Sequence, residues 1–370
     1  MVQSDIRNGV LGLSREALIA LWKQSQDGNG MELPITKGAK LYCAKSGRET
    51  VIFSFPGIRQ AKIKSAKGFT VKIKTDEKDG TCFIVENSSD RDEDLFAYVV
   101  LDLLELDFRS EKQPAERRFN VIVSRMKAWR QFMKDRGRRL TASQELGLAG
   151  ELFFLKNCLE RNISISFLQS FWTGPLRSAR DFAFGSDVYT EVKTSTVPLP
   201  LRVKIDSLEQ LDATSVRRLL LCAVVMQTDE LTPQVAGGTQ DHSDRFQTLD
   251  QMAEEVELKI QPACLKEEFK TLLIIAGLTE EQRKESRRRF CPQSLQFFRA
   301  EHLPRLTPGK IPGITKATYE IELLDASGVL PVGSENAQIE ESEAWKLLIA
   351  SGAAEPLVIP TDPEDQDLQH

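Results

Sequence analysis

Three charged residues in the segment 180–195 have the types and spacing that phosphodiester chemistry requires. Asp181 opens a short apolar run, and Glu191 and Lys193 lie inside the next one. Alternate side chains of a strand share a face, so Glu191 and Lys193 project together while Val192 points the other way into a core. Carboxylates are hard oxygen ligands for Mg²⁺, and a neighbouring lysine can orient or deprotonate an attacking water. The pattern predicts metal-dependent hydrolysis of a phosphodiester bond.

A helix over 141–160 is predicted to precede these strands. Thr141 and Gln144 fit a capping box at its start, and leucines follow at helical spacing. Two glycines lower its helix propensity, which favours close packing against another element. Glu151 lies inside this apolar run, where a carboxylate is costly unless it is paired or bound to a metal. Glu151 is therefore the fourth candidate site residue.

The order of these features resembles one branch of the PD-(D/E)XK nuclease superfamily. The helix motif Gly-x-x-Gly-Glu-Leu, a Trp-x-Gly-Pro turn at 172–175, Asp181-Phe182 and Glu191-Val192-Lys193-Thr194-Ser195 follow one another as in a bacterial group called "putative PD-(D/E)XK family member". The resemblance covers residues 140–230. It implies a restriction-type or phage-defence nuclease, encoded beside a DNA methylase and ATPase or helicase-like partners. It also implies a glutamate on the helix before the catalytic strands, where Glu151 stands.

Simpler explanations compete for several of these residues. A charged strand that faces solvent also produces Glu-Val-Lys. Asp187 is a rival metal ligand, although its Gly-Ser-Asp context is more typical of a turn. Trp172 could stack on a nucleobase, whereas a tryptophan before Gly-Pro more often packs beneath a sheet.

Other hydrolytic chemistries lack their residues. Three histidines, His242, His302 and His370, do not support the paired-histidine chemistry of other nucleases. Neither a G-x-S-x-G elbow nor a phosphate-binding P-loop motif occurs. The six cysteines are scattered without a C-x-x-C pair, which argues against structural zinc and favours free thiols in a reducing compartment.

Charge is distributed unevenly along the 370 residues, whose net charge is −5. Arg109 to Leu140 holds eleven basic residues against three acids, whereas Glu335 to the end holds nine acids against Lys346. This asymmetry favours one phosphate-facing side, although a solvated amphipathic helix gives the same pattern. The candidate DNA-contacting residues are Arg136, Arg138, Arg139, Arg287, Arg288, Arg289, Thr194 and Ser195.

The hydrophobic periodicity predicts an α/β protein with a restriction-endonuclease-like core, whose mixed central sheet is flanked by helices. Short strands between 38 and 86 predict an N-terminal α+β module, residues 1–110. A basic helical connection follows at 111–137, and the nuclease-like core spans 138–325. Strands near 201–207, 216–228, 294–301 and 317–324 would complete its sheet. Residues 326–370 form a C-terminal extension with an acidic tail.

We therefore expect a Mg²⁺-dependent DNA endonuclease, with Mn²⁺ able to substitute. Asp181, Glu191 and Glu151 would bind the metal, and Lys193 would position the water. Two alternatives stay open: a DNA-binding or scaffolding subunit of a defence complex, or a nuclease for RNA or branched repair intermediates. Without a signal peptide or a membrane-length apolar stretch, we expect a cytoplasmic protein. The sequence is also compatible with a homodimer.

Overall fold

The computed structural model describes residues 13–352 apart from 14, 25–30, 33–37, 44–47, 59–64, 66–67, 77–79, 89–92, 112, 136–138, 166–167, 177, 186, 215, 231–244, 262, 312 and 315. Two compact units divide the chain, Met1–Arg138 and Arg139–His370, and each is described by itself. The predicted acidic tail lies outside the described residues, as do Arg136 and Arg138.

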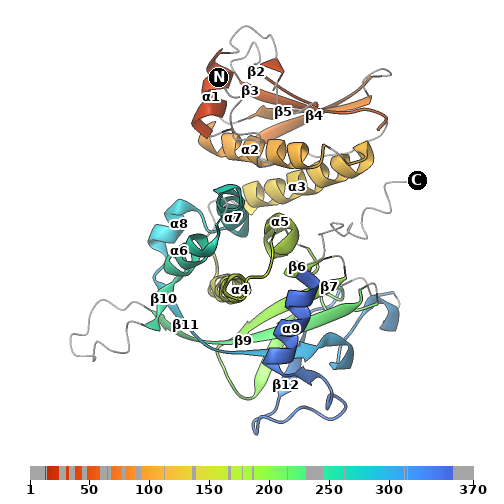
Figure 1. The fold of residues 1–370 in the computed structure, drawn as a ribbon, viewed down its shortest axis with the longest axis vertical. Coiled ribbons are helices and arrows are strands. Elements are labelled where there is room, and N and C mark those ends of the chain that lie inside the picture. Colours follow the sequence, from red (N-terminus) through yellow and green to blue (C-terminus); the bar gives the residue numbers. More distant parts are fainter. Residues whose placement is uncertain are drawn as a thin grey trace, which may run out of the picture. The chain divides into compact units, whose positions relative to one another are not determined.

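Among its described residues, the N-terminal unit combines an antiparallel five-stranded sheet with three helices (Figure 1). Its strand order is β1-β2-β3-β5-β4, with β1 at Met31–Glu32, β2 at Ala39–Cys43, β3 at Glu49–Phe55, β4 at Phe69–Asp76 and β5 at Gly80–Asn87. The helices are α1 at Arg15–Gln24, α2 at Glu93–Arg109 and α3 at Ala115–Asp135. The hairpin strands and the helices that the sequence periodicity predicts are present.

Helix α3 lies within the segment 111–137 that is predicted to be a basic connection, and two of its arginines form ion pairs inside the N-terminal unit. Arg118 pairs with Asp107 at 2.5 Å and donates to the Ser54 carbonyl. Arg125, only 4% exposed, pairs with Asp102 at 3.4 Å. The basic character of this segment therefore reflects internal packing as well as surface charge.

The C-terminal unit is built on a mixed sheet with the order β10-β11-β9-β7-β6, and β13 also pairs with β11. β7 and β9 run parallel, and the other pairs of this sheet are antiparallel. The strands are β6 at Phe182–Phe184, β7 at Val188–Ser195, β9 at Arg218–Glu230, β10 at Gln247–Thr248, β11 at Arg288–Arg299 and β13 at Gln338–Ile339. The helices are α4 at Ala142–Glu160, α5 at Leu168–Phe171, α6 at Leu249–Lys259, α7 at Ala263–Ala276, α8 at Glu280–Glu285 and α9 at Glu341–Gly352. The predicted α/β class with a mixed sheet flanked by helices is confirmed.

The two faces of this sheet carry different layers, because alternate residues of its strands point to opposite sides. Leu220, Cys222 and Val224 of β9 belong to a core shared with α4, α6, α7 and α9. Leu219 and Leu221 belong to a second core beneath a ribbon of two strands, β8 at Leu201–Ile205 and β12 at Tyr319–Leu324. The expectation that 201–207 and 317–324 extend the central sheet is wrong. These strands pair with each other, and their apolar residues cover a sheet face.

The described residues after 325, up to Gly352, pack against the same unit through α9. Trp345 of α9 stacks on Phe154 of α4, with ring centroids 5.5 Å apart, and meets Phe297 of β11 edge-on at 5.3 Å.

Within the described residues, no helix is both long and apolar enough to cross a membrane.

Candidate active site

Glu191 and Lys193 project from β7 toward the same side of the sheet. Val192, between them, packs into the helix-side core, as the strand alternation predicts. Lys193 Nζ lies 2.9 Å from Glu191 Oε1, and the two side chains are 14% and 1% exposed. The Glu-x-Lys motif is therefore a buried ion pair and not a charged strand facing solvent.

Asp181 lies at the edge of the sheet beside this pair. β6 pairs with β7 only from Phe182↔Thr190 to Phe184↔Val188, so the next residues of β7 pair with β9 on one side and have no described strand on the other. The Val192 N–H instead donates to Asp181 Oδ2 at 2.8 Å. Asp181 thus satisfies a backbone donor at an open sheet edge, where an unpaired group would be costly.

Glu151 approaches the same edge from helix α4. The predicted capping box is confirmed: Thr141 and Gln144 each bond the other's backbone. Glu151 Oε2 accepts a hydrogen bond from Trp172 Nε1 at 2.6 Å. A Cβ placed on Gly174 would lie 2.7 Å from Glu151 Oε2 and 2.9 Å from Asp181 Oδ1. Both carboxylates therefore flank the same bare glycine Cα.

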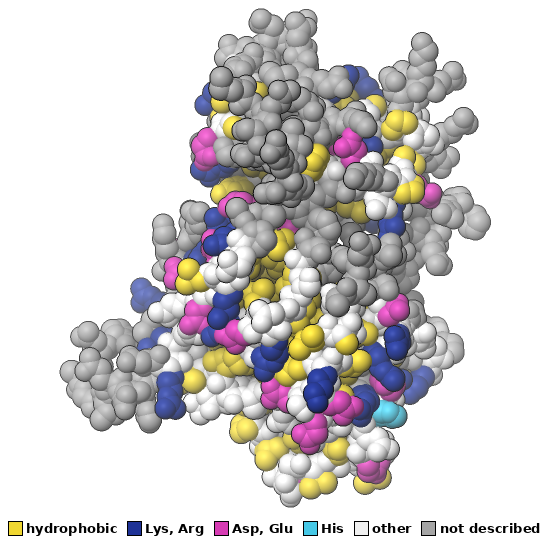
Figure 2. Space-filling model, viewed as in Figure 1, with side chains coloured by type: hydrophobic (Ala, Val, Ile, Leu, Met, Phe, Trp, Pro, Cys, Tyr) yellow, Lys and Arg dark blue, Asp and Glu magenta, His cyan; other side chains and the backbone are white. Residues whose placement is uncertain are grey.

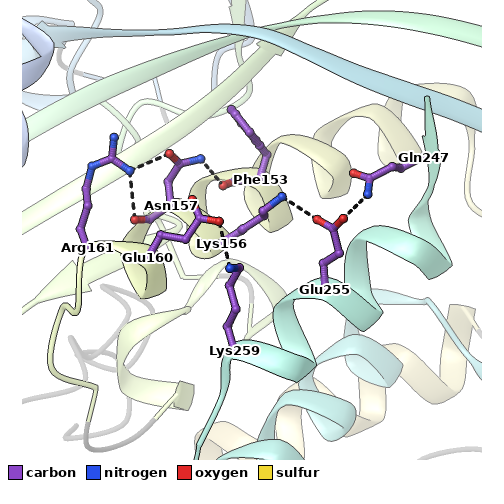
Figure 3. Close-up of polar contacts among 8 residues, drawn as sticks. All are labelled: Phe153, Lys156, Asn157, Glu160, Arg161, Gln247, Glu255 and Lys259. Carbon is purple, nitrogen blue, oxygen red and sulfur yellow. Dashed lines mark hydrogen bonds and ion pairs between the residues drawn. The ribbon is translucent and has the colours of Figure 1, made fainter. Parts of the chain in front are cut away.

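Helix α4 is held in this position on two sides. A Cβ at Gly150 would overlap the hydroxyl of Thr194 in β7, so only glycine permits the observed approach of helix to strand. On the other side, Lys156 pairs with Glu255 of α6 at 2.5 Å, and Lys259 of α6 pairs with Glu160 at 3.0 Å (Figure 3). These contacts fix the helix that carries Glu151.

Burial raises the pKa of all three carboxyl groups. For Glu191, burial together with the charge of Asp181 raises the pKa to about 8, although Lys193 opposes the shift. Burial and the charge of Asp181 raise the pKa of Glu151 well above its ordinary range, and burial also raises that of Asp181. Burial alone would lower the pKa of Lys193, but Glu191 and Asp181 outweigh it and the net shift is upward. The site therefore concentrates negative charge that a cation would stabilise.

The donor set fits a hard divalent cation such as Mg²⁺. Glu191 Oε2 is buried and accepts no hydrogen bond from the described residues, while Oε1 is engaged by Lys193. No three His, Cys, Asp or Glu side chains in the described part of the chain are already spaced around a common metal position. The fit rests on an unpartnered carboxylate oxygen and on three oxygen-donor side chains at one edge, which suit Mg²⁺ or Mn²⁺.

Two of the predicted DNA-contacting arginines, Arg288 and Arg289, pair with acids away from this edge. Arg288 and Arg289, at the start of β11, pair with Glu145 and Asp229. Along β9, Asp229 is eight residues beyond the position paired with Glu191, which is about 26 Å. On the face of this unit that Figure 2 shows, acidic and basic side chains are interleaved.

The other described residues that were predicted to contact DNA differ in their exposure and in the hydrogen bonds and ion pairs that they already form. Arg139 pairs with Glu285 at 2.7 Å on the surface, and Arg287 is exposed. Ser195 Oγ donates to the Val197 carbonyl and accepts from its N–H, so its hydroxyl is used locally. Thr194 Oγ1 is buried against Gly150 with no hydrogen-bond partner among the described residues.

Other residues complete the site. Trp172 is fully buried, packs on Phe269 and bonds Glu151, so the packing interpretation of this tryptophan is correct. Arg180, 8% exposed, lies over the Tyr189 ring and donates to the Asp212 carbonyl, and its charge also acts on Glu191. Asp187 is exposed in the turn, as its sequence context predicts. In the sequence, the Trp-x-Gly-Pro turn marks Trp172, and the adjacent pair Arg180-Asp181 marks Arg180.

Asp206, just after β8, was not anticipated. Its Oδ2 lies 3.8 Å from Lys193 Nζ, and its Oδ1 pairs with Lys204 at 2.8 Å. No short motif marks this residue, because it reaches Lys193 only through the ribbon that folds over the sheet.

A cavity of about 300 Å³ lies elsewhere, between α4 and α6. Phe153 and Lys156 line it from α4, and Met252 and Glu255 from α6. Lys156 is five residues beyond Glu151, which turns it about 140° around the helix axis. The cavity is therefore separate from the carboxylate site.

The sequence model of one protein family, described as "Putative PD-(D/E)XK family member", matches residues 41–324. The match extends from β2 to β12 and includes all four clustered side chains. Comparisons with curated proteins and with solved structures found no match.

Proposed function

Because this chain belongs to the family described as "Putative PD-(D/E)XK family member", we propose that it is a Mg²⁺-dependent endonuclease that hydrolyses DNA phosphodiester bonds. The supporting observation is the meeting of Glu151, Asp181, Glu191 and Lys193 at one sheet edge. Three neighbouring carboxylates with raised pKa values have little structural benefit on their own, because their mutual repulsion opposes folding.

Asp181, Glu191 and Glu151 would hold the divalent cation. When bound, the cation supplies Lewis-acid stabilisation of negative charge on the phosphate and lowers the pKa of water. The chain contributes the oxygen donors and their burial, which strengthens every charge interaction within the site.

Lys193 has the clearest role of its own. Glu191 and Asp181 raise its pKa, which favours the ammonium form near neutral pH. An ammonium group donates hydrogen bonds and cannot accept a proton. Of the two roles open to this lysine, orienting the attacking water and stabilising charge on the phosphate oxygens is therefore favoured over acting as a base.

The biological setting is a further part of the proposal. The family resemblance supports a restriction or phage-defence role in the cytoplasm, with a methylase and ATPase or helicase-like partners. A strict scaffolding role would leave a complete set of acids and a lysine unused. Nuclease activity on RNA or branched DNA depends on the same four residues, so substrate choice is a separate question.

Cleavage of supercoiled plasmid by the purified full chain tests the activity. We expect nicking with Mg²⁺ or Mn²⁺, binding without efficient turnover with Ca²⁺, and no cleavage in excess EDTA. Lys193→Ala should lower the rate at least about 100-fold, whereas Lys270→Ala should not, because that lysine pairs with Glu267 on the surface of α7. Full-rate cleavage in EDTA, or by Lys193→Ala, would refute the mechanism. Parallel reactions with RNA and branched DNA identify the substrate class.

A further inference from the structure

The turn at 172–175 is bonded closely to the chain around Asp181. The backbone N–H groups of Thr173 and Gly174 both donate to the Asp181 carbonyl, at 2.8 and 3.1 Å. Thr173 Oγ1 donates to the Arg180 carbonyl at 2.7 Å, and Trp172 forms a β-bridge with Phe182. The turn is therefore bonded through its backbone to the residue that supplies one carboxylate.

The same turn also reaches the second carboxylate. Trp172 is fully buried in the helix-side core, its ring 5.9 Å from that of Phe269. A buried indole N–H needs an acceptor, and here the acceptor is Glu151 Oε2 at 2.6 Å. The bare Cα of Gly174 leaves room for that oxygen beside Asp181 Oδ1. One short turn thus contacts acids that come from helix α4 and from the edge of β6.

We propose that Trp172 is a positioning residue that holds Glu151 for a divalent cation. Its N–H occupies Oε2 and fixes the rotation of the carboxylate, which leaves Oε1 for the ion. The packing of the ring on Phe269 and the bonds of the turn to Asp181 hold the donor still. This inference rests on the proposed metal-dependent function, because it gives Trp172 a role only toward the bound cation.

Hydrogen bonds that neighbouring groups donate to metal-binding carboxylates increase the affinity for the metal. Their removal typically weakens metal affinity about 10- to 100-fold, because the ligand must then be ordered by the metal alone. Trp172→Phe keeps an aromatic ring against Phe269 and removes the N–H donor. We expect this variant to bind Mn²⁺ at least about 10-fold more weakly than the unmodified chain.

The chain contains a matched control. Trp345 is also buried in this unit, and its Nε1 donates to Glu341 Oε1 at 2.9 Å. Trp345→Phe therefore removes an equivalent hydrogen bond that lies outside the site. Isothermal titration of Mn²⁺ into the full-length unmodified chain, Trp172→Phe and Trp345→Phe, without nucleic acid, compares the two tryptophans directly.

Each outcome distinguishes the inference from the proposed function. Weaker binding by Trp172→Phe, with unchanged binding by Trp345→Phe, supports a positioning role. Equal affinities in all three proteins, or equal losses in both variants, would overturn it and leave the nuclease proposal intact. Absence of Mn²⁺ binding by the unmodified chain would overturn both.

A second measurement covers the case in which Trp172→Phe does not fold. In the ¹⁵N-labelled unmodified chain, the indole N–H resonance of Trp172 should shift on titration with Mg²⁺, while that of Trp345 should stay in place. An unperturbed Trp172 resonance under conditions where Mg²⁺ binds would contradict the inference.

Discussion

The Asp181 carboxylate accepts a hydrogen bond from the Val192 backbone N–H at 2.8 Å, one residue beyond Glu191 on β7. A single side chain thus terminates the pairing at the sheet edge and supplies a candidate metal ligand. The next residue, Lys193, belongs to the buried ion pair. The position of Asp181 relative to Glu191 and Lys193 is therefore set by its hydrogen bond to the strand that carries both residues.

Asp181→Asn and Asp181→Ala should therefore differ in stability but not in activity. Asparagine keeps an acceptor for the Val192 N–H and removes a buried charge, so its thermal midpoint should equal or exceed that of the unmodified chain. Alanine leaves the donor unpaired, which costs about 1–3 kcal/mol and partly cancels the relief of repulsion. Both variants should lose plasmid cleavage. Calorimetry that ranks alanine above asparagine would contradict this structural role.

The two glycines of α4 should respond in opposite ways to alanine. Gly150→Ala forces its new methyl group into Thr194, and we expect a loss of about 1–3 kcal/mol. Gly147 has open space around the same position, so Gly147→Ala should stabilise the protein by about 0.5–1 kcal/mol through helix propensity. Urea denaturation measures both. A neutral Gly150→Ala would show that α4 and β7 are not in close contact.

The metal-free protein should lose stability as the pH rises from about 5 to 8. Glu191 has its ordinary pKa of 4.5 when unfolded and a pKa of about 8 when folded, so the folded state binds the extra proton. That stabilisation is present at low pH and is lost as the pH rises through 8. One such group changes the thermal midpoint by about 3 °C per pH unit.

Glu191→Gln should reduce this slope, and so should saturating Mg²⁺. Glu255→Gln is the control. Hydrogen bonds from Lys156 and Gln247 outweigh burial and lower the pKa of Glu255, so its contribution lies at acid pH. A slope between about pH 5 and 8 that Glu191→Gln leaves unchanged would contradict the assignment.

DNA affinity should depend on the exposed arginines more than on the paired ones. Each phosphate that is neutralised contributes about −0.9 to the slope of log K against log salt. Arg287→Ala should lower the slope magnitude, because this side chain is exposed. Arg289→Ala should change it less, since Arg289 already pairs with Asp229. Fluorescence anisotropy at several salt concentrations measures both, and equal slopes would remove Arg287 from the interface.

The Arg136, Arg138 and Arg139 triple variant extends the same measurement. If these residues position DNA, the variant should weaken binding to all sequences alike and lower the slope magnitude, since phosphate contacts carry no sequence information. Unchanged affinity would remove these three arginines from the DNA interface.

The local features of the site follow from the amino-acid sequence alone. Strand alternation places Glu191 and Lys193 on one face, the capping box begins α4 after Thr141, and the apolar run around Glu151 predicts a buried carboxylate. These features depend on interactions between residues close in sequence. The side-chain periods of a strand, 2 residues, and of a helix, 3.6 residues, can be recognised in a single sequence.

Only the tertiary structure decided how these elements meet. The contacts of Glu151 with Trp172, of Lys193 with Asp206 and of Gly150 with Thr194 join segments whose approach no local pattern specifies. The exclusion of β8 from the central sheet also depends on packing, because its alternating apolar residues fit a ribbon over the sheet as well as a strand within it. Composition likewise could not separate cations that pair internally, such as Arg118 and Arg125, from cations free to meet phosphate.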